Sequence, residues 1–368
     1  MLYDVTRLPL DRLLLASTKA TEGLARLDER ILRSPIGEGF LQRQDFMDAV
    51  SSLWIDGELV HIEDLVLHDA HMDIRAPTHE MAIANRILRT RRQIFGNGPL
   101  WALSPSGLSR LRGNDVADKG NTLHLHVSPG EQYPVAPTDD EDAMLLSDEL
   151  SAIDRLIARS TATLASITTK DTQPQHRADS LTRDPDWNED ERLGEWKQSL
   201  KATEGLPSVL RAAVALDAWQ RLEVLQRSPW LGRQLAAALL REEGLTTSHL
   251  AALNSGLRAI PRERRNAGTQ VERISAVLDS LREAAALGMK EHDRLLNAKS
   301  RMERRLTGRR SNSRLPELIK LVLSRPVVST AMIVKALGTT PQGAVGLANQ
   351  LELREMTGRG RFRAWGVI

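Results

Sequence analysis

The chain has 368 residues, no cysteine and a formal net charge of +2 at pH 7. The absence of thiols excludes disulfide frameworks, cysteine-based zinc fingers, iron–sulfur clusters and thiol catalysis, and it suits a reducing cytoplasm. Aromatic residues make up only 4% of the chain, against 41% for all hydrophobic residues, which favours helix packing over β-sandwich packing. We therefore expect a mainly α protein, with a large helical body and a smaller appended module.

The first elements expected in chain order are amphipathic helices. Apolar spacing predicts one or two of them over residues 10–46, interrupted near Pro35, where two glycines follow the proline. A second pair is expected on either side of a turn at Asp56 and Gly57, and a further helix over residues 78–95. No apolar run is long enough to span a bilayer, so we expect a soluble, cytoplasmic protein without a membrane partner.

The middle of the chain changes character after residue 95. Residues 96–142 are rich in Gly, Pro, Asn and Ser, and one alternating segment at 122–128 predicts a strand. Residues 170–191 are polar and acidic, which predicts a loop. Two core helices follow over 206–243, broken at Ser228 and Pro229, and then a long helix, in one or two pieces, over 262–305.

These elements divide the chain into four predicted segments. They are an N-terminal helical region at residues 1–95, a loop-rich insertion with a short strand at 96–190, a helical core at 191–305 and a terminal module at 306–368.

The charge of the C-terminal part differs from that of the rest of the chain. Residues 299–368 hold fourteen Lys or Arg against four Glu and no Asp, which leaves a net charge of −8 on residues 1–298. A basic end on an acidic body is typical of nucleic-acid contact.

The terminal module has the signals of a winged helix-turn-helix. One helix is expected over residues 315–324, and a second begins after Ser329 and stops at Gly338. Thr340 then supplies a capping oxygen and Pro341 the first position of a third helix, to about residue 351. A strand, a glycine-rich tip and a returning strand complete the module.

Such a module fits duplex DNA. Small residues at the start of the last helix allow entry into a major groove, and arginines on the wing gain phosphate contacts by releasing counterions. We assign Thr340, Gln342 and Asn349 to the recognition helix, and Arg354, Arg359, Arg361 and Arg363 to contacts with the DNA backbone. The alternative is a protein-interaction module whose arginines are only solvated. DNA binding is favoured because helix spacing, wing arginines and charge segregation agree.

Three stretches resemble the Fic family, helical enzymes that transfer AMP or related groups to protein hydroxyls. Residues 49–70 are similar to the family's inhibitory segment, with Ser52, Asp56 and Gly57 at its motif positions and Asp in place of the usual Glu. Residues 206–225 and 231–245 are similar to the helices that lead into and out of the active site. The resemblance implies a Fic-like helical body, with the inhibitory-like segment in residues 1–95.

The catalytic loop of an active Fic enzyme, His-Pro-Phe-x-Asp/Glu-Gly-Asn-Gly-Arg, is missing. Residues 225–233 read LQRSPWLGR, and only Gly232 and Arg233 match the end of that motif. The family's general base, metal-binding acid and phosphate-binding nest have no counterpart, and phosphoryl and nucleotidyl transfer depend on such groups. We therefore expect no catalytic residue, no metal and no cofactor: a Fic-like core lacking the catalytic loop, at residues 191–305.

Other candidate sites are weaker. His61, His68 and His71 stand near several acids, but without cysteine or a metal motif we favour a solvated surface. His124 and His126 would share one face of the predicted strand, and the same interpretation applies. The seven tryptophans are mostly expected in the core, and Trp230 is hypothesised to fill the vacated nucleotide pocket.

We interpret the chain as a DNA-binding transcriptional regulator with a catalytically inactive Fic-like body. A homodimer is expected, because one winged helix offers limited contact area and operators are commonly two-fold. Two alternatives stay open. One is an unorthodox nucleotidyl transferase acting on protein, and the other is an adaptor or antitoxin-like module that docks onto a protein partner.

Overall fold

A computed structural model describes residues 3–5, 8–72, 76–117, 187–306, 314–356 and 363–367. The chain forms two compact units, Met1–Asp115 with Glu189–Ile368, and Val116–Asn188. The second unit lies almost wholly outside the described residues, as does the predicted strand with His124 and His126. In the described part, helices dominate and the strands form one small sheet, which confirms the mainly α fold class. None of the described helices is long and apolar enough to cross a membrane.

The described residues of the N-terminal half of the first unit form five helices. They are α1 (Leu10–Leu32), α2 (Gly37–Asp56), α3 (Ile62–Asp69), α4 (His79–Gly96) and α5 (Pro105–Ala117). The predicted breaks at Pro35 and at Asp56–Gly57 are confirmed. Gly57 closes α2 in the left-handed conformation, with φ of 90°, which suits a residue without Cβ. Thr78 caps α4 by accepting a hydrogen bond from the Met81 N–H.

Helix α5 corrects the prediction that the chain is loop-like from residue 96. Its glycines and serines conceal it in the sequence, but Leu108 and Leu111 are buried one turn apart. The Ser104 hydroxyl accepts a hydrogen bond from the Gly107 N–H at the start of the helix. A Cβ at Gly107 would lie 1.8 Å from the Trp101 carbonyl oxygen, so glycine is required there by packing.

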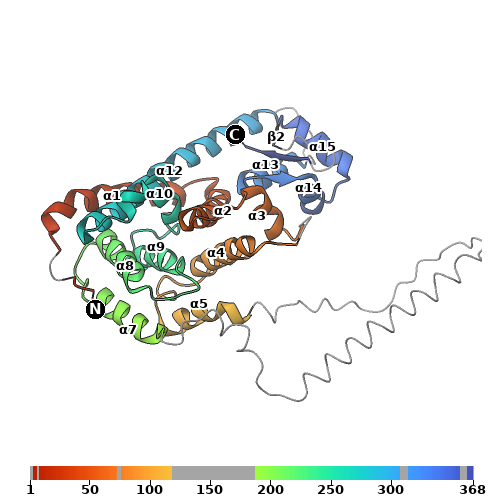
Figure 1. Ribbon diagram of the computed structural model, residues 1–368. Helices are drawn as coiled ribbons and strands as arrows, with labels where there is room; N and C mark the ends of the chain where they lie inside the picture. The colour runs from red at the N-terminus through yellow and green to blue at the C-terminus, as the bar shows by residue number, and fades with distance from the viewer. Residues whose placement is uncertain are drawn as a thin grey trace, which may run out of the picture. The chain divides into compact units, whose positions relative to one another are not determined.

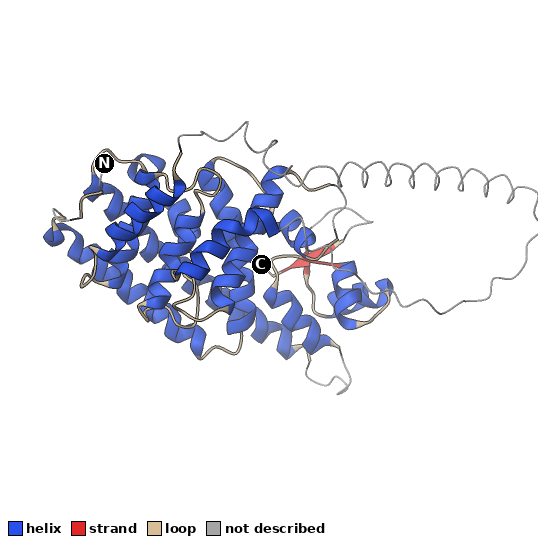
Figure 2. Cartoon of the chain, turned by 90° about the horizontal axis from the view of Figure 1, so that it is seen from below, coloured by secondary structure: helices blue, strands red, loops and turns tan. Residues whose placement is uncertain are grey.

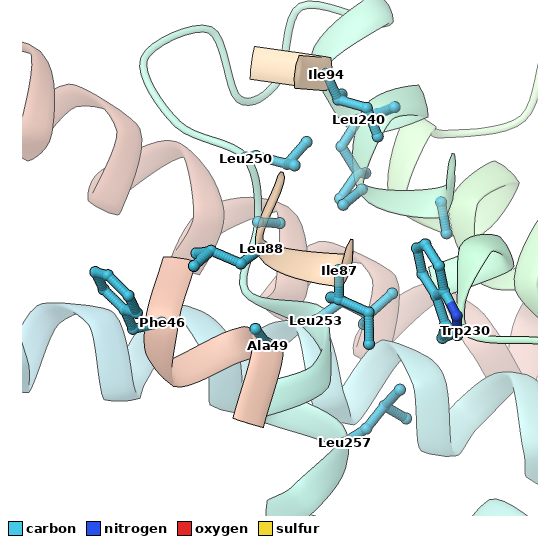
Figure 3. Packing of buried hydrophobic residues seen from close by; sticks show 14 of the residues in the cluster. Phe46, Ala49, Ile87, Leu88, Ile94, Trp230, Leu240, Leu250, Leu253 and Leu257 are labelled. Atoms are coloured by element: carbon cyan, nitrogen blue, oxygen red, sulfur yellow. The ribbon is translucent and has the colours of Figure 1, made fainter. Parts of the chain in front are cut away.

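The helical core continues after the second unit. It comprises α7 (Glu189–Lys201), α8 (Ser208–Leu222), α9 (Leu231–Glu242), α10 (Leu253–Ala259), α11 (Arg262–Arg265) and α12 (Gln270–Arg304). Helix α12 packs along α1, α8 and α10 (Figure 1). Apolar side chains of α2, α4, α9 and α10 meet in the core, among them Phe46, Ile87, Leu240 and Leu253 (Figure 3). Helix α10 was not predicted, whereas the helix predicted in one or two pieces over 262–305 is formed by α11 and α12.

The C-terminal module has the predicted order of elements. It comprises α13 (Leu315–Ser324), β1 (Val328–Ser329), α14 (Thr330–Leu337), α15 (Pro341–Gln350), β2 (Arg354–Glu355) and β3 (Ala364–Gly366). The antiparallel sheet has the order β1-β3-β2, with Val328 opposite Trp365 and Glu355 also opposite Trp365. Figure 2 shows these short strands in red. Trp365 is 1% exposed and anchors the sheet on the helices.

The module is fastened to the body by buried polar contacts on α2. The Arg43 guanidinium donates to the Arg325 carbonyl oxygen at 2.6 Å, and it reaches the Val367 carbonyl oxygen at 3.4 Å. Arg294 of α12 donates to the same Val367 oxygen at 2.6 Å. Both guanidinium groups pair with Glu291, which balances their charge. Helix α2 therefore joins the body to the winged helix through backbone groups of the module.

Candidate functional site

The helix-turn-helix is formed by α14, the turn at residues 338–340 and α15. Ser329 caps α14 by accepting from the Met332 N–H, and Gly338 ends it with φ of 60°. Arg314 adds hydrogen bonds to the carbonyl oxygens of Leu337 and Gly338. The Ser329 cap and the Gly338 stop were predicted from the sequence, whereas the Arg314 contacts were not. They fix the angle at which α15 leaves the turn.

Helix α15 buries one side and exposes the other. Ala344 and Ala348 are buried against the module, whereas Gln342 and Asn349 are exposed two turns apart on one face. Gly346 lies between them, and a Cβ there would have no neighbour within 4 Å. The exposed face therefore has no side chain at Gly346 and carries the amide side chains of Gln342 and Asn349. Asn and Gln amides bind adenine in a bidentate manner in a major groove.

Thr340 has a structural role in this arrangement. Its hydroxyl accepts a hydrogen bond from the Gly343 N–H at 3.1 Å, as expected of an N-cap. Gly343 itself sits close to Thr339, since a Cβ there would lie 2.5 Å from the Thr339 Oγ1. The first turn of α15 is thus held by the Thr340 cap and by close packing at Gly343. The exposed amide side chain in this turn is that of Gln342.

The wing is described only at its base. Arg354 is exposed on β2. Arg363 is paired with Glu355 across the sheet at 2.7 Å, and its guanidinium lies 5.4 Å from the centroid of the Trp365 ring. The hydrogen bond with Glu355 raises the pKa of Arg363. Arg359 and Arg361 lie outside the described residues. An exposed pair such as Arg363–Glu355 is weak, so the guanidinium remains exchangeable with a phosphate.

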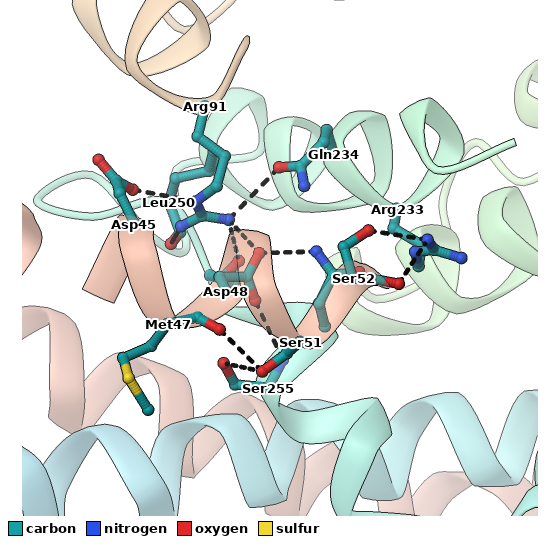
Figure 4. A network of polar contacts seen from close by, with 12 residues as sticks. Asp45, Met47, Asp48, Ser51, Ser52, Arg91, Arg233, Gln234, Leu250 and Ser255 are labelled. Atoms are coloured by element: carbon teal, nitrogen blue, oxygen red, sulfur yellow. Dashed lines mark hydrogen bonds and ion pairs between the residues drawn. The ribbon is translucent and has the colours of Figure 1, made fainter. Parts of the chain in front are cut away.

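A second polar site lies where α9 begins in the body. Arg233 is 4% exposed, and its guanidinium donates to both carboxylate oxygens of Asp56, at 2.5 and 3.0 Å. It also donates to the Ser52 hydroxyl at 2.8 Å (Figure 4). The residues singled out at the end of the missing Fic loop and in the inhibitory-like segment are thus brought together, 177 or more positions apart in sequence. A bidentate pair of this kind is geometrically specific.

Gly232 and Trp230 shape the backbone before Arg233. A Cβ at Gly232 would lie 2.3 Å from the Trp219 ring, so only glycine lets the two helices approach. Trp230 is 4% exposed and packs in the core (Figure 3). The Arg86 guanidinium lies 5.5 Å from its ring centroid. Trp230, in the segment between α8 and α9, is therefore buried against side chains of the helical body.

Beside this pair lies a buried network that the sequence analysis missed. Arg91 is 1% exposed, and its guanidinium binds Asp45 at 2.9 Å and Asp48 at 2.7 Å. It also donates to the Leu250 carbonyl oxygen at 3.0 Å and to Gln234 at 3.3 Å (Figure 4). The network ties α2 and α4 to α9 and to the segment before α10. Burial raises the pKa of Asp45, although Arg91 opposes that shift.

Asp69 at the end of α3, beside the histidines noted in the sequence, is engaged by two arginines. Asp69, the acid next to His68, accepts hydrogen bonds from Arg92 at 2.5 and 3.1 Å and from Arg325 at 3.2 Å. It therefore bridges the body and the winged helix. Among the residues that the structure describes, no three His, Asp or Glu side chains gather closely enough to hold a metal ion.

Fold and site together define a helical protein with a C-terminal helix-turn-helix DNA-binding domain. A family described as "HTH DNA binding domain" matches residues 315–368. A second, described as "Protein of unknown function (DUF1612)", matches residues 181–307. The chain is 48% identical to the protein y4cF of Sinorhizobium fredii over 387 aligned positions that cover all of both chains. This chain belongs to the same family as that protein.

Proposed function

We propose that the protein is a transcriptional regulator that binds duplex DNA through α15 and the wing. The observation that carries the proposal is the exposed face of α15, where Gln342 and Asn349 flank Gly346 above a buried alanine side. A face of this kind enters a major groove without steric penalty. The match to a DNA-binding helix-turn-helix over residues 315–368 supports the same proposal.

The wing would add affinity without sequence preference. Arg354 and Arg363 at its base would contact backbone phosphates, together with Arg359 and Arg361, which the sequence analysis assigned to the same role. Each phosphate contact adds roughly 0.9 to the slope of log affinity against log salt. We further propose a cytoplasmic homodimer, because two copies would double this limited contact area and match a two-fold operator.

We propose that the helical body is Fic-like and catalytically inactive. The pair between Asp56 and Arg233 supports this, because both terminal nitrogens of the Arg233 guanidinium already donate to Asp56 or Ser52. An arginine at the end of a Fic loop would otherwise cradle phosphates. The segment before it, residues 225–232, offers no histidine or carboxylate for transfer chemistry.

Selection of DNA fragments by the purified full-length protein tests the DNA proposal. Enrichment of one palindromic sequence is expected, and its half-site spacing would report the symmetry of the dimer. Replacing Gln342 and Asn349 together by alanine should abolish the enrichment while leaving non-specific binding in place. Recovery of random fragments by the wild-type protein would contradict specific recognition.

Two rival functions give different results in simple assays. The first rival is docking of the wing onto a protein. It is favoured by the Arg363–Glu355 pair, because one arginine of the wing is already paired within the module instead of being free for a phosphate. In that case, alanine at Arg354, Arg359, Arg361 and Arg363 would leave gel shifts unchanged. A residual transferase would move label from ATP to a protein substrate, and the inactive body predicts no transfer.

A further inference from the structure

A cavity at the C-terminal end of α2 is lined by arginines that the proposed function does not use. It has a volume of about 400 Å³ and is bounded by the last residues of α2 and by α10, α11 and the turn between them. Arg258, Arg262 and Arg265 line it together with Trp54 and Asp56. This volume is within the range of small-molecule sites in proteins.

Within the described residues, the three arginines have no carboxylate or hydrogen-bond acceptor as a partner. In the part of the chain that the structure describes, none of Arg258, Arg262 and Arg265 forms an ion pair within 4 Å or a hydrogen bond from its guanidinium. The Nε of Arg265 is buried without an acceptor. A buried donor without a partner costs free energy, so an acceptor that fills the cavity would be stabilised there.

Trp54 orients two of these groups. The guanidinium carbons of Arg258 and Arg265 lie 5.3 and 5.6 Å from the centroid of its ring. Both distances are those of cation–π contacts, which hold a guanidinium without using its N–H donors. Trp54 is 38% exposed, in contrast to the core position expected for most tryptophans. The ring is therefore a platform at the cavity rather than part of the core.

The local charge is positive within a body that is acidic overall. Two carboxylates, those of Asp56 and Glu263, lie near four guanidinium groups, which gives a formal excess of two positive charges. The guanidinium groups belong to Arg233, Arg258, Arg262 and Arg265. Burial, Arg233 and Arg262 lower the pKa of Arg265, because each disfavours its positive charge. The carbonyl groups at the end of α2 are partly satisfied by the N–H groups of Gly57 and Glu58, which reduces their opposition to an anion.

We propose that this cavity binds a small phosphate monoester whose organic part is apolar or planar. A dianion matches the excess of two positive charges, and a phosphate presents acceptor oxygens to several convergent N–H donors. The remaining walls are apolar, from Ile55, Ala259, Ile260 and Pro261, and would cover the organic part. The inference is independent of DNA binding and uses arginines outside the segments that resemble the Fic family.

Titration calorimetry of the full-length protein with phenyl phosphate tests the proposal. Phenyl phosphate should bind at least tenfold more tightly than inorganic phosphate, and more tightly than benzoate, which carries one charge. Phenol, with the ring but no charge, should give no measurable binding. No binding of phenyl phosphate at about 10 mM, or tighter binding of benzoate, would overturn the proposal.

Variants of neighbouring arginines give the matched comparison. Arg265→Gln and Arg258→Gln should each weaken phenyl phosphate binding at least tenfold. Arg264→Gln should leave the affinity unchanged. Arg264 lies on the same short helix, but it does not line the cavity, and its guanidinium is 2.7 Å from the Asp279 carboxylate. Arg258 is exposed, so its variant retains the fold even if Arg265→Gln does not. Equal affinities for Arg258→Gln and Arg264→Gln would refute the site.

Discussion

The winged helix and the centre of the body are stabilised by contacts of different range. In the winged helix, α14 and α15 are set by caps within three residues, such as Ser329 to Met332 and Thr340 to Gly343. In the body, Arg91 and Arg233 reach acids that are 43 and 177 positions away. Local signals therefore define the helices of the first region, whereas the buried polar contacts of the second join residues far apart in the sequence.

Asp48→Asn is expected to have the largest effect, because it removes charge balance from the body centre. Asp48 is fully buried and accepts hydrogen bonds from Arg91, from Asn254 and from the Ser255 N–H. Removing one partner of a buried pair costs about 3–5 kcal/mol of unfolding free energy. Urea denaturation at pH 7 would measure it.

A surface pair supplies the control for this prediction. Arg26 and Glu22 on α1 are paired with side chains 72% and 56% exposed. Arg26→Gln should change the unfolding free energy by less than about 0.5 kcal/mol. Similar losses for the Asp48 and Arg26 variants would mean that buried pairing does not distinguish the body centre.

Gly232→Ala and Gly346→Ala compare the two regions with the same change. In the body, the added Cβ would lie 2.3 Å from the Trp219 ring, and overpacking of this kind costs about 1–3 kcal/mol. In α15, the added Cβ meets nothing within 4 Å, and alanine should stabilise the helix by about 0.5–1 kcal/mol. Thermal unfolding of both variants checks the opposite signs. The same sign for both variants would show that the two glycines do not differ in local packing.

The sequence separation of the contacts explains which parts of the structure could be predicted from the sequence. Ser329, Gly338, Thr340 and Pro341 each act on their own helix, so the helix-turn-helix could be predicted from local patterns. The position of Arg233 beside Ser52 and Asp56 could not be predicted in this way, although all three residues had been singled out by their resemblance to Fic motifs. Spacing along the chain carries no information about which distant arginine an acid will meet.

Two omissions in the body have the same physical origin. Helix α10 is seven residues long and has Gly256 where a Cβ would lie 2.0 Å from the Ser280 carbonyl oxygen. Helix α5 likewise holds Gly107 against a backbone carbonyl. In both helices tertiary packing selects a residue that lowers helix propensity. Local patterns underestimate such helices because their stability comes from their neighbours.

Thr340→Ala tests whether capping fixes the recognition helix. Loss of the hydroxyl leaves the Gly343 N–H without its acceptor, which should cost about 1 kcal/mol. Thr340→Ser keeps the oxygen and should behave like the wild type. Amide hydrogen exchange of residues 341–344 would report the loosened first turn. Equal exchange in the two variants would show that Thr340 does not act as a cap.

The smallest expected effect concerns Asp69, which links the two regions. Burial alone would raise the pKa of Asp69, but the hydrogen bonds from Arg92 and Arg325 outweigh it and hold the pKa below its usual value. A carboxyl with a depressed pKa stabilises the folded state above about pH 4 and loses that contribution as pH falls through the folded pKa. The difference in unfolding free energy between the wild type and Asp69→Asn should therefore be about 1 kcal/mol or less at pH 7. It should shrink steadily below pH 4, as measured by urea denaturation at several pH values. A difference that stays constant down to pH 3 would show that the bridge from Asp69 to Arg325 does not couple the winged helix to the body.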